Sequence, residues 1–245
     1  MEKRVEPLVE NTEISQIFGI VVAVFAVIIT LVIFIFWQRR RSVGRSVLLT
    51  GLSDAGKTLL YARLIHSKFV ETYLSSKENV GDITIKDQNL QIIDIPGHER
   101  LRNKFFDKYK SSARGLIFVI DSVTVQKDIR DVAEYLYTLL SDSSIESKLP
   151  ILILCNKQDQ TMAKTSKAIK AMLEKEINLV RVTKLKQLVD TDASVETTYL
   201  GAGEKNFEFS HLNNQVDFAE CSLHCKESES EVNIEQLNNW LHKIV

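Results

Sequence analysis

Apolar residues follow two patterns along this chain: one unbroken run near the N-terminus, and short runs that alternate with amphipathic segments. The alternation begins near residue 46 and is typical of a parallel sheet flanked by helices. Strands are expected at Ser46–Thr50, Asp82–Ile85, Leu90–Asp94, Gly115–Asp121, Ile151–Cys155 and Val216–Glu220. Helices are expected at Lys57–His66, Arg100–Tyr109, Val125–Leu140, Ala163–Leu185 and Ile234–Ile244. The pattern predicts one α/β domain over residues 46–245, with a mostly parallel six-stranded sheet covered by helices on both faces.

Two stretches break the alternation. Ser141–Lys148 is a polar connection, and Val189–Asn214 is a longer one with scattered charge and little apolar periodicity. Connections of that length are uncommon inside a compact domain unless they are functional or flexible. We therefore expect a flexible surface insertion near residues 189–214, centred on Thr191–Lys205, rather than a second domain.

The N-terminal run predicts a helix that crosses a membrane. Residues 14–38 carry no charged side chain, and Ile17–Trp37 is almost entirely aliphatic or aromatic. A helix of that length spans roughly 31 Å, close to the thickness of a bilayer's hydrocarbon core. A secretory signal peptide would have a shorter apolar core, about 7–15 residues, followed by a small-residue cleavage site. Here the run ends in Phe36-Trp37, so a transmembrane helix over residues 14–38 is the better interpretation.

Basic residues beside the apolar run indicate its orientation. Arg39, Arg40, Arg41 and Arg45 follow the run, whereas the preceding segment is dominated by glutamate. Since lysine and arginine are retained on the cytosolic side, residues 1–13 should form a short lumenal tail. Residues 39–45 should form a basic juxtamembrane linker, with the α/β domain in the cytosol.

Composition limits the possible partners. A formal net charge of −1 over 245 residues argues against direct nucleic-acid binding through general electrostatics. Three cysteines are too few for a disulfide framework and suit a reducing compartment. Cys221 and Cys225, with His224 between them, lack the spacing of the usual zinc sites, so no metal site is expected there.

The segment Gly51-Leu-Ser-Asp-Ala-Gly-Lys-Thr58 matches the phosphate-loop pattern, in which two glycines flank four residues and a Lys-Thr pair follows. It lies between a predicted strand and a predicted helix, where backbone N–H groups and the helix dipole favour phosphate. Lys57 should reach the β- and γ-phosphates, and the Thr58 hydroxyl should ligate Mg²⁺. The expected phosphate-binding residues are Gly51, Leu52, Ser53, Asp54, Ala55, Gly56, Lys57, Thr58 and Leu59.

Two further motifs, Asp94-Ile-Pro-Gly97 and Asn156-Lys157-Gln-Asp159, each follow another predicted strand. The Asp159 carboxylate can accept hydrogen bonds from the ring N–H and the exocyclic amine of guanine, whereas adenine presents the opposite polarity. Asn156 and Lys157 should shape and cover the base. Asp94 should hold Mg²⁺ through water, and the N–H of Gly97 should sense the γ-phosphate. The expected ligands are therefore GTP and Mg²⁺.

A fourth element follows the last predicted strand. Glu220-Cys-Ser222-Leu223 fits the loop that contacts the guanine oxygen through backbone N–H groups. Leu223 stands where GTPases usually have alanine, and a contact made by the backbone tolerates that change. Ser222 and Leu223 therefore join the expected nucleotide-binding residues.

These motifs resemble the Ras-type GTPases near the Arf branch, which implies a Ras-like P-loop GTPase domain. The apolar run together with Gly51–Thr58 and Asp94-Ile-Pro-Gly-His-Glu-Arg100 is similar to the β-subunit family of the signal recognition particle receptor. Arf proteins fit less well, because they carry a myristoylated amphipathic N-terminus, whereas Glu2 follows Met1 here. Another membrane-anchored, Arf-like cycling GTPase with a different effector remains the alternative. The resemblance is also carried by Lys110–Arg114, Phe207–Ser210 and Leu241–Val245.

The resemblance implies a single-pass protein of the endoplasmic reticulum membrane that acts in co-translational protein targeting. Its GTP-loaded domain would bind the N-terminal domain of the receptor α subunit and tether that subunit to the membrane. Association with the signal recognition particle, the ribosome and the translocon would be indirect.

The resemblance also places a nucleotide-sensing loop, switch I, within Glu71–Ser76. Thr72, Tyr73, Leu74 and Ser75 are expected to contact the nucleotide, with Thr72 or Ser75 as the Mg²⁺ ligand.

The position that holds a water-orienting glutamine in Ras-type enzymes is His98 here. A neutral imidazole can accept a proton from water, so His98 is a candidate catalytic residue. Ser53 adds bulk where Ras-type loops have glycine, and slow intrinsic GTP hydrolysis is therefore expected. Two hypotheses stay open: a GTP-regulated binding module that rarely turns over, and a GTPase that cycles with each round of targeting.

Overall fold

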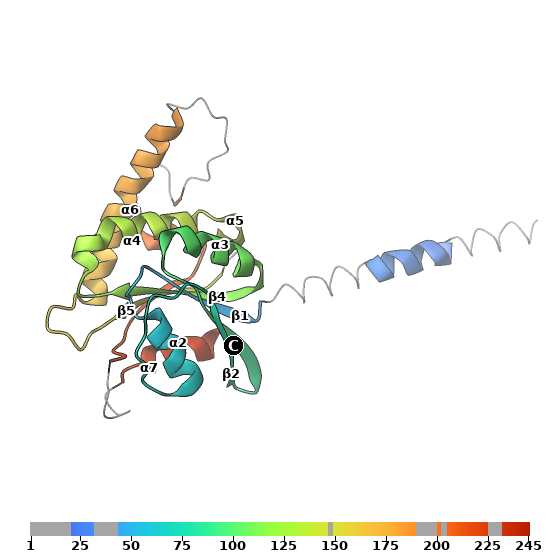
Figure 1. The fold of residues 1–245 in the computed structure, drawn as a ribbon. Coiled ribbons are helices and arrows are strands. Elements are labelled where there is room, and N and C mark those ends of the chain that lie inside the picture. The colour runs from blue at the N-terminus through green and yellow to red at the C-terminus, as the bar shows by residue number, and fades with distance from the viewer. Residues whose placement is uncertain (1–20, 32–43, 147–148, 190–199, 202–204, 225–231) are drawn as a thin grey trace, which may run out of the picture. The chain divides into compact units, whose positions relative to one another are not determined.

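The computed structural model describes residues 21–31, 44–146, 149–189, 200–201, 205–224 and 232–245 (Figure 1). The chain divides into two parts, residues 1–43 and 44–245. In the first part, residues 21–31 form a helix whose large apolar side chains are exposed. The remainder of the predicted span, residues 14–20 and 32–38, lies outside the described residues. Within the described residues, no helix has both the length and the apolar character needed to cross a bilayer.

Residues 44–245 contain a six-stranded sheet with the order β2-β3-β1-β4-β5-β6. All neighbouring strands are parallel except β2 and β3, which are antiparallel. The prediction of an α/β fold with a mostly parallel six-stranded sheet is confirmed. The strands are β1 (Ser46–Thr50), β2 (Asn79–Ile85), β3 (Gln88–Asp94), β4 (Ala113–Asp121), β5 (Ile151–Asn156) and β6 (Val216–Glu220).

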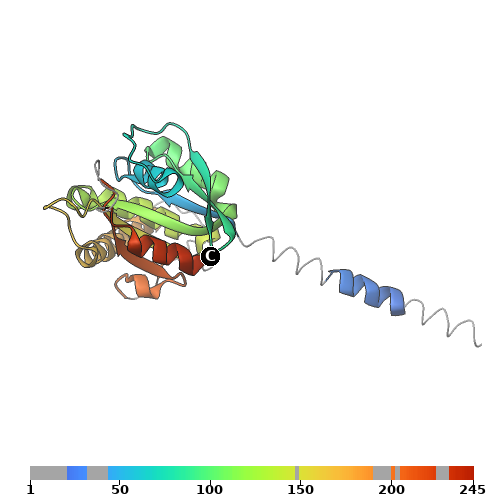
Figure 2. The same ribbon diagram turned by 90° about the horizontal axis from the view of Figure 1, so that it is seen from below.

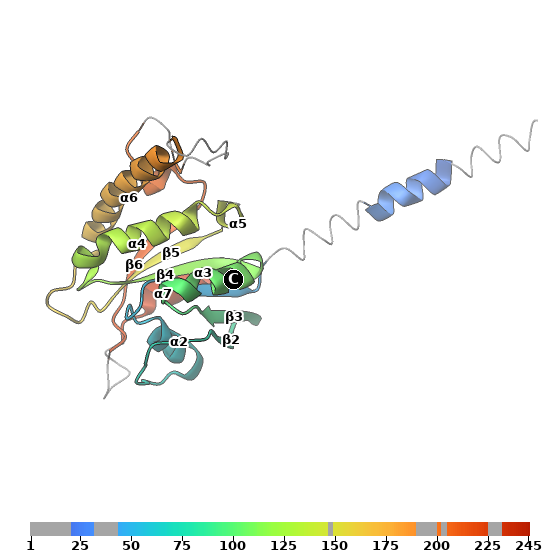
Figure 3. The same ribbon diagram turned by 45° about the horizontal axis from the view of Figure 1, so that its top comes forward.

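Helices cover both faces of this sheet. One face carries α2 (Lys57–His66) and α7 (Glu235–Ile244), and Figure 2 shows α7, in red, on the side seen from below. The other face carries the larger helical layer, which Figures 1 and 3 show across the sheet from α2. That layer consists of α3 (Glu99–Tyr109), α4 (Val125–Leu140), the short α5 (Ser143–Glu146) and α6 (Ser166–Val189), and the 3₁₀ turns η1 (Lys110–Ser112) and η2 (Phe209–His211) complete the described elements.

The central strands are buried because helices pack on both of their faces. On β1 and β4, side chains alternate between two core clusters: Val47 and Ile117 pack towards α2 and α7, whereas Leu48 and Phe118 pack towards α3–α6. All four are fully buried. A strand that is apolar on both faces reads as a continuous hydrophobic run, which explains why these strands were recognisable from sequence.

The β2–β3 hairpin is longer than the sequence predicts. Its turn consists of Lys86 and Asp87, whose φ angles are 47° and 61°. Two successive residues with positive φ match the right-handed twist of the flanking strands, so pairing continues up to Ile85 and Gln88. In the first half of this edge strand the exposed Val80 is apolar, whereas its half-buried neighbours Asn79 and Gly81 offer no apolar side chain, so these residues gave no clear apolar alternation.

The polar connection at residues 141–148 contains α5, which the sequence did not predict. Ile145 of this helix is fully buried. Asn214, also buried, donates hydrogen bonds from Nδ2 to the carbonyls of Ile145 (2.6 Å) and Leu149 (3.0 Å). A single apolar residue is too little for periodicity to reveal the turn.

Parts of the stretch at residues 189–214 pack against the domain. Helix α6 extends to Val189, and Phe207 and Phe209 are 2 % and 4 % exposed within the α3–α6 core. The buried Arg181 donates to the carbonyls of Leu200 (3.3 Å) and Lys205 (2.6 Å). One α6 side chain thus holds Leu200 and Lys205, while residues 190–199 and 202–204 lie outside the described residues.

Candidate functional site

The phosphate-loop segment connects β1 to α2 at the carboxyl edge of the sheet. Gly51 and Gly56 have φ angles of 139° and 95°. A Cβ at Gly51 would lie 2.2 Å from the Val119 carbonyl oxygen, and one at Gly56 would lie 2.3 Å from Asn156 Nδ2. Both positions therefore require glycine. Gly56 is the N-cap of α2 and makes no side-chain capping hydrogen bond, so the first N–H groups of the helix are available to an anion.

Lys57 places a buried ammonium at the centre of this loop. Its side chain is 5 % exposed, and Nζ donates a hydrogen bond to the Leu52 carbonyl oxygen at 2.6 Å. Burial lowers the pKa of Lys57 from 10.5 to about 8, against the opposing charges of Asp94 and Asp54. A phosphate beside Nζ would offset the cost of burying this ammonium, which the two aspartates offset only in part.

Asp94, Thr58 and Ser75 form a cluster of oxygens beside Lys57. Thr58 Oγ1 donates to Asp94 Oδ2 at 2.8 Å and lies 3.2 Å from Ser75 Oγ, and Asn79 Nδ2 also donates to Asp94 Oδ2 at 2.9 Å. Burial raises the pKa of Asp94, although the hydrogen bonds from Asn79 and Thr58 and the charge of Lys57 oppose that rise. Asp94 Oδ1 is buried without a hydrogen-bond partner. Oxygen donors of this kind suit Mg²⁺ and its water ligands.

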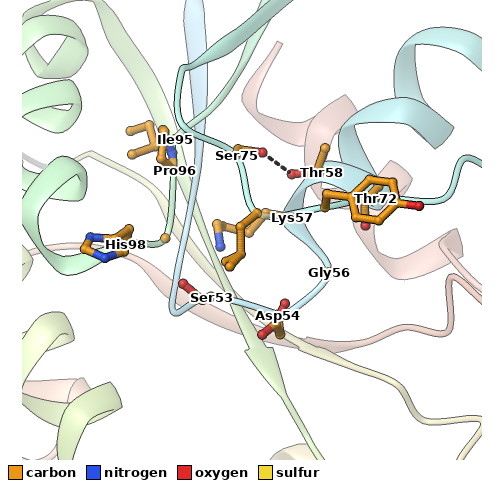
Figure 4. A pocket seen from close by; sticks show the side chains of 13 residues that line it. Ser53, Asp54, Gly56, Lys57, Thr58, Thr72, Ser75, Ile95, Pro96 and His98 are labelled. Atoms are coloured by element: carbon orange, nitrogen blue, oxygen red, sulfur yellow. Dashed lines mark hydrogen bonds between the residues drawn. The ribbon is translucent and has the colours of Figure 1, made fainter.

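The cluster borders a pocket of about 50 Å³ (Figure 4). The expected switch I residues Thr72, Tyr73, Leu74 and Ser75 all line it. Of the two hydroxyls proposed as the Mg²⁺ ligand, that of Ser75 makes the contact with Thr58. The other lining residues are Ser53, Asp54, Gly56, Lys57, Thr58, Ile95, Pro96, Gly97 and His98.

Gly97 brings the turn after β3 against the phosphate loop. A Cβ at this position would lie 2.6 Å from Ser53 N, 2.7 Å from Lys57 Nζ and 2.8 Å from Leu52 C. Only glycine permits this approach. The N–H-bearing backbone of residue 97 therefore lies next to the lysine expected to hold the γ-phosphate.

His98 lies at the rim of the same pocket and caps α3. Its Nδ1 accepts a hydrogen bond from the Arg100 N–H at 3.3 Å, and the side chain is exposed. In Figure 4 the imidazole lies apart from the Thr58–Ser75 pair. The capping bond accounts for the presence of His98 without catalysis, so its catalytic role stays a prediction.

The base-side residues are linked to the phosphate loop through Asn156. This buried side chain donates from Nδ2 to the Ala55 carbonyl oxygen at 2.9 Å. Ser222 Oγ donates to Asp159 Oδ1 at 3.0 Å, and Gln158 N donates to the Cys221 carbonyl oxygen at 3.2 Å. The loops after β1, β5 and β6 are thereby connected, and Asp159 itself is exposed.

The two expected leucines lie beside the phosphate loop. Leu223 is buried, and its side chain lies 3.9 Å from the position that a Cβ at Gly56 would take. Leu59 of α2 packs on the same core cluster as Leu223.

Sequence reasoning did not identify the roles of Cys221, Asp121 and Ser122, which hold these loops together by hydrogen bonds. Cys221 Sγ donates to Asn156 Oδ1 at 3.4 Å, and burial raises the pKa of this thiol, which keeps it a neutral donor. Lys157 Nζ donates to Asp121 Oδ2 at 2.6 Å, and Gln158 Nε2 donates to Ser122 Oγ at 2.9 Å. The signal for Asp121 and Ser122 was their place directly after a buried strand, at the edge where the motifs gather.

Comparison with known proteins shows to which family the chain belongs. Residues 42–216 match the model of the family described as "Signal recognition particle receptor beta subunit". The chain belongs to this β-subunit family. The signal recognition particle receptor subunit beta of Rattus norvegicus is 42% identical over 232 residues, covering 92% of this chain and 86% of the relative. The β-subunit resemblance inferred from the motifs is thus confirmed.

Solved structures agree with this family and with the fold. The structure titled "The Structure of the Mammalian SRP Receptor" superposes with a TM-score of 0.72 at 40% identity, covering 82% of this chain and all of that one. A receptor complex from Chaetomium thermophilum, titled SRb-GTP/SRX, has a TM-score of 0.66 at 21% identity and covers 82% of this chain. That second likeness concerns the fold alone. The roles of individual site residues in this β-subunit family member stay predictions.

Proposed function

We propose that this chain is the GTP-binding, membrane-anchored β subunit of a signal recognition particle receptor, which tethers the α subunit to the endoplasmic reticulum in a GTP-dependent way. The observation that carries the proposal is the convergence of the loops after β1, β3, β5 and β6 on one edge of the sheet. Hydrogen bonds join Ala55 to Asn156 and Asp159 to Ser222, and Gly97 lies against Ser53 and Lys57. Ligands of open α/β sheets bind at this edge.

The site's chemistry favours a guanine nucleotide with Mg²⁺. Lys57 and the first N–H groups of α2, which receive no side-chain cap from Gly56, supply positive potential for the phosphates. Thr58, Ser75 and Asp94 offer oxygens for Mg²⁺, directly or through water, and the buried Asp94 Oδ1 has no other partner. When bound, Mg²⁺ would neutralise charge on the β- and γ-phosphates. Asp159 would accept from guanine, with Ser222 fixing one of its oxygens.

The loop at residues 72–75 connects nucleotide to partner in this proposal. Tyr73 and Leu74 line the phosphate pocket, yet they are 86 % and 71 % exposed. Exposed large apolar side chains at a ligand site are a common mark of a protein-binding surface. The partner is the N-terminal domain of the receptor α subunit, and the SRX complex of the fungal relative supports that choice. The signal recognition particle, ribosome and translocon would associate through the α subunit.

The anchor is residues 14–38, with residues 1–13 in the lumen and the GTPase domain in the cytosol. The described portion, Val21–Leu31, is helical, and Thr30 is its only polar residue. Thr30 Oγ1 donates to the Val27 carbonyl oxygen at 2.8 Å, so its hydroxyl is satisfied within the helix, as a bilayer core requires. The basic residues 39–41 and 45 favour this orientation.

Hydrolysis is slow in this proposal, because His98 has only one ring nitrogen available for water and Ser53 adds bulk beside the phosphates. His98 uses Nδ1 to cap α3, which leaves Nε2 to orient water. The side chain of Ser53, at the rim of the pocket, limits access for an arginine supplied by an activating protein.

The test is to purify the full chain in mild detergent and identify its bound nucleotide and proteins. Stoichiometric GTP together with the receptor α subunit is the expected result. Lys57→Ala should remove the nucleotide and the α subunit, whereas Lys127→Ala, on the exposed face of α4, should remove neither. Normal α-subunit binding by a nucleotide-free Lys57→Ala protein would contradict GTP dependence. Absence of any guanine nucleotide from the wild type would contradict the assigned ligand.

A further inference from the structure

Two residues at the end of β4 hold the loop that carries the guanine-reading motif. Strands β4 and β5 are paired so that Asp121 lies opposite Asn156. The fully buried Ser122 receives a hydrogen bond from Gln158 on its hydroxyl and one from Lys164 on its carbonyl, both at 2.9 Å. Its own amide donates to the Asn156 carbonyl oxygen at 3.0 Å. The backbone of the loop is thus fixed by Ser122, which leaves the side chain of Lys157 to Asp121.

Asp121 holds Lys157 by a short, charged hydrogen bond. Oδ2 accepts from Lys157 Nζ at 2.6 Å, and the two side chains are 12% and 28% exposed. Hydrogen bonds between ionised partners are among the stronger ones, and partial burial reduces their screening by salt. The Lys157 ammonium is therefore held at one place on the site rather than free in solvent.

The backbone of Lys157 needs such support. Its φ angle is 67°, in the left-handed region that residues other than glycine, asparagine and aspartate rarely adopt. Residues persist in such conformations only where their surroundings over-determine them, and they gather at ligand sites. Here Asp121 supports the side chain, and Ser122 supports the residues on both sides of Lys157.

We propose that Asp121 is a positioning residue for guanine binding. It fixes the Lys157 ammonium, so that the aliphatic stem already lies where it will cover the base when a nucleotide arrives. This inference rests on the proposed GTP site. Asp121 itself does not touch the base in this account. Its contribution is pre-organisation, which increases affinity by reducing the freedom lost on binding.

A purely structural role for Asp121 is the competing explanation. Its other oxygen, Oδ1, accepts from the N–H groups of Val123 (2.9 Å) and Thr124 (3.4 Å) at the start of α4. Loss of that capping interaction would destabilise the helix whatever happened to Lys157. The variant must therefore keep the cap and remove only the charge, and Asp121→Asn does so because its amide oxygen can still accept from Val123.

A matched control exists at the opposite end of α4. Asp142 Oδ2 accepts from Lys110 Nζ at 2.8 Å, while Oδ1 accepts from the Ser144 N–H at 2.9 Å. Like Asp121, Asp142 pairs with one lysine and accepts a hydrogen bond from a backbone N–H at the start of a helix. Unlike Asp121, it follows the C-terminus of α4. Asp142→Asn should reproduce any general cost of removing such a carboxylate without altering the guanine site.

The experiment measures the binding and release of fluorescent N-methylanthraniloyl-GDP by the full chain in detergent. Asp121→Asn should weaken affinity about five- to tenfold, mainly through faster release, as is usual for changes within one interface. Asp142→Asn should leave both quantities unchanged. Inorganic tripolyphosphate has no base, so its competition for the phosphate loop should be the same in wild type and Asp121→Asn.

A double-mutant cycle with Lys157→Ala separates the two explanations. If Asp121 acts through Lys157, Asp121→Asn should cause no further loss in the Lys157→Ala background. An equal loss in both backgrounds, or equal weakening of GDP and tripolyphosphate, would overturn the inference in favour of a structural role. GDP binding by the wild type with no effect of Asp121→Asn would overturn the inference alone. Failure of the wild type to bind GDP would overturn the proposed function as well.

Discussion

Replacing Lys57 should stabilise the nucleotide-free protein while abolishing its nucleotide binding. Lys57 is charged at neutral pH although its side chain is 5 % exposed, and burial lowers its pKa from 10.5 to about 8. The gap between those two values corresponds to about 3 kcal/mol of unfavourable free energy in the folded state. The hydrogen bond from Nζ to Leu52 would be lost with the ammonium, so Lys57→Met should gain about 1–2 kcal/mol.

The pH dependence gives this prediction a second readout. Below about pH 8 the lysine is protonated in both the folded and the unfolded chain, and the full penalty is present. Between about 8 and 10.5 the unfolded chain binds more protons than the folded one, so the free energy of unfolding of the wild type rises with pH. The stability advantage of Lys57→Met should therefore shrink across that interval.

Urea unfolding of the full chain in detergent, after nucleotide removal, measures both effects. Lys127→Met is the control, because Lys127 lies on the exposed face of α4 and should change stability by less than about 0.5 kcal/mol. Added GDP should stabilise the wild type and not Lys57→Met. A Lys57→Met protein that is less stable than the wild type at pH 7, or an advantage that does not vary with pH, would refute the reasoning.

Three other changes test separate parts of the molecule. Asp159→Asn should shift binding from GDP towards xanthosine diphosphate, because the new amide can donate to the second carbonyl of xanthine; competition binding decides, and unchanged guanine preference would count against Asp159. Gly56→Ala should abolish nucleotide binding, because the added Cβ would lie 2.3 Å from Asn156 Nδ2; calorimetric titration with GDP would reveal any retained affinity. Phe207→Ala should lower the free energy of unfolding by about 3–5 kcal/mol, whereas Tyr73→Ala, at an 86 % exposed residue, should change it little. A small effect of Phe207→Ala in urea unfolding would show that residues 205–214 are not part of the core.

The location of the site was predictable because its residues follow strands. Leu48, Phe118 and Ile153 belong to runs that are apolar on both faces, and such runs are visible without knowing their neighbours. The phosphate loop begins where the run containing Leu48 ends, and the Asn156–Asp159 motif begins where the run containing Ile153 ends. Parallel strands then bring the motifs to one edge without further information.

Contacts between the loops could not be predicted in the same way. The bond between Asp121 and Lys157 depends on the pairing of β4 with β5, and on the register that sets Asp121 opposite Asn156. Neither strand order nor register is present in local periodicity. The same holds for Cys221, whose thiol reaches Asn156 only because β6 lies next to β5.

Burial of Phe207 and Phe209 was missed for a different reason. The two rings are two residues apart and pack edge to face, with centroids 5.3 Å apart. A pair of aromatic residues within a polar stretch yields neither the helical nor the strand period. The backbone N–H of Phe207 donates to the side chain of Asn178, and that of Phe209 donates to the side chain of Glu174, both on α6. These side chains satisfy backbone groups that a neighbouring strand or helical turn would otherwise satisfy.

The hydrogen bonds from Arg181 to the carbonyls of Leu200 and Lys205 have an evolutionary and a practical consequence. Because the Arg181 side chain fixes the backbone at Leu200 and Lys205, the positions of these two residues do not depend on the number of residues between Val189 and Leu200. Closing a longer loop between fixed ends is inexpensive, about 0.6 kcal/mol for each doubling of its length. Homologues should therefore vary freely in length here, and an epitope or fluorophore can be inserted between Val189 and Leu200 without disturbing the nucleotide edge.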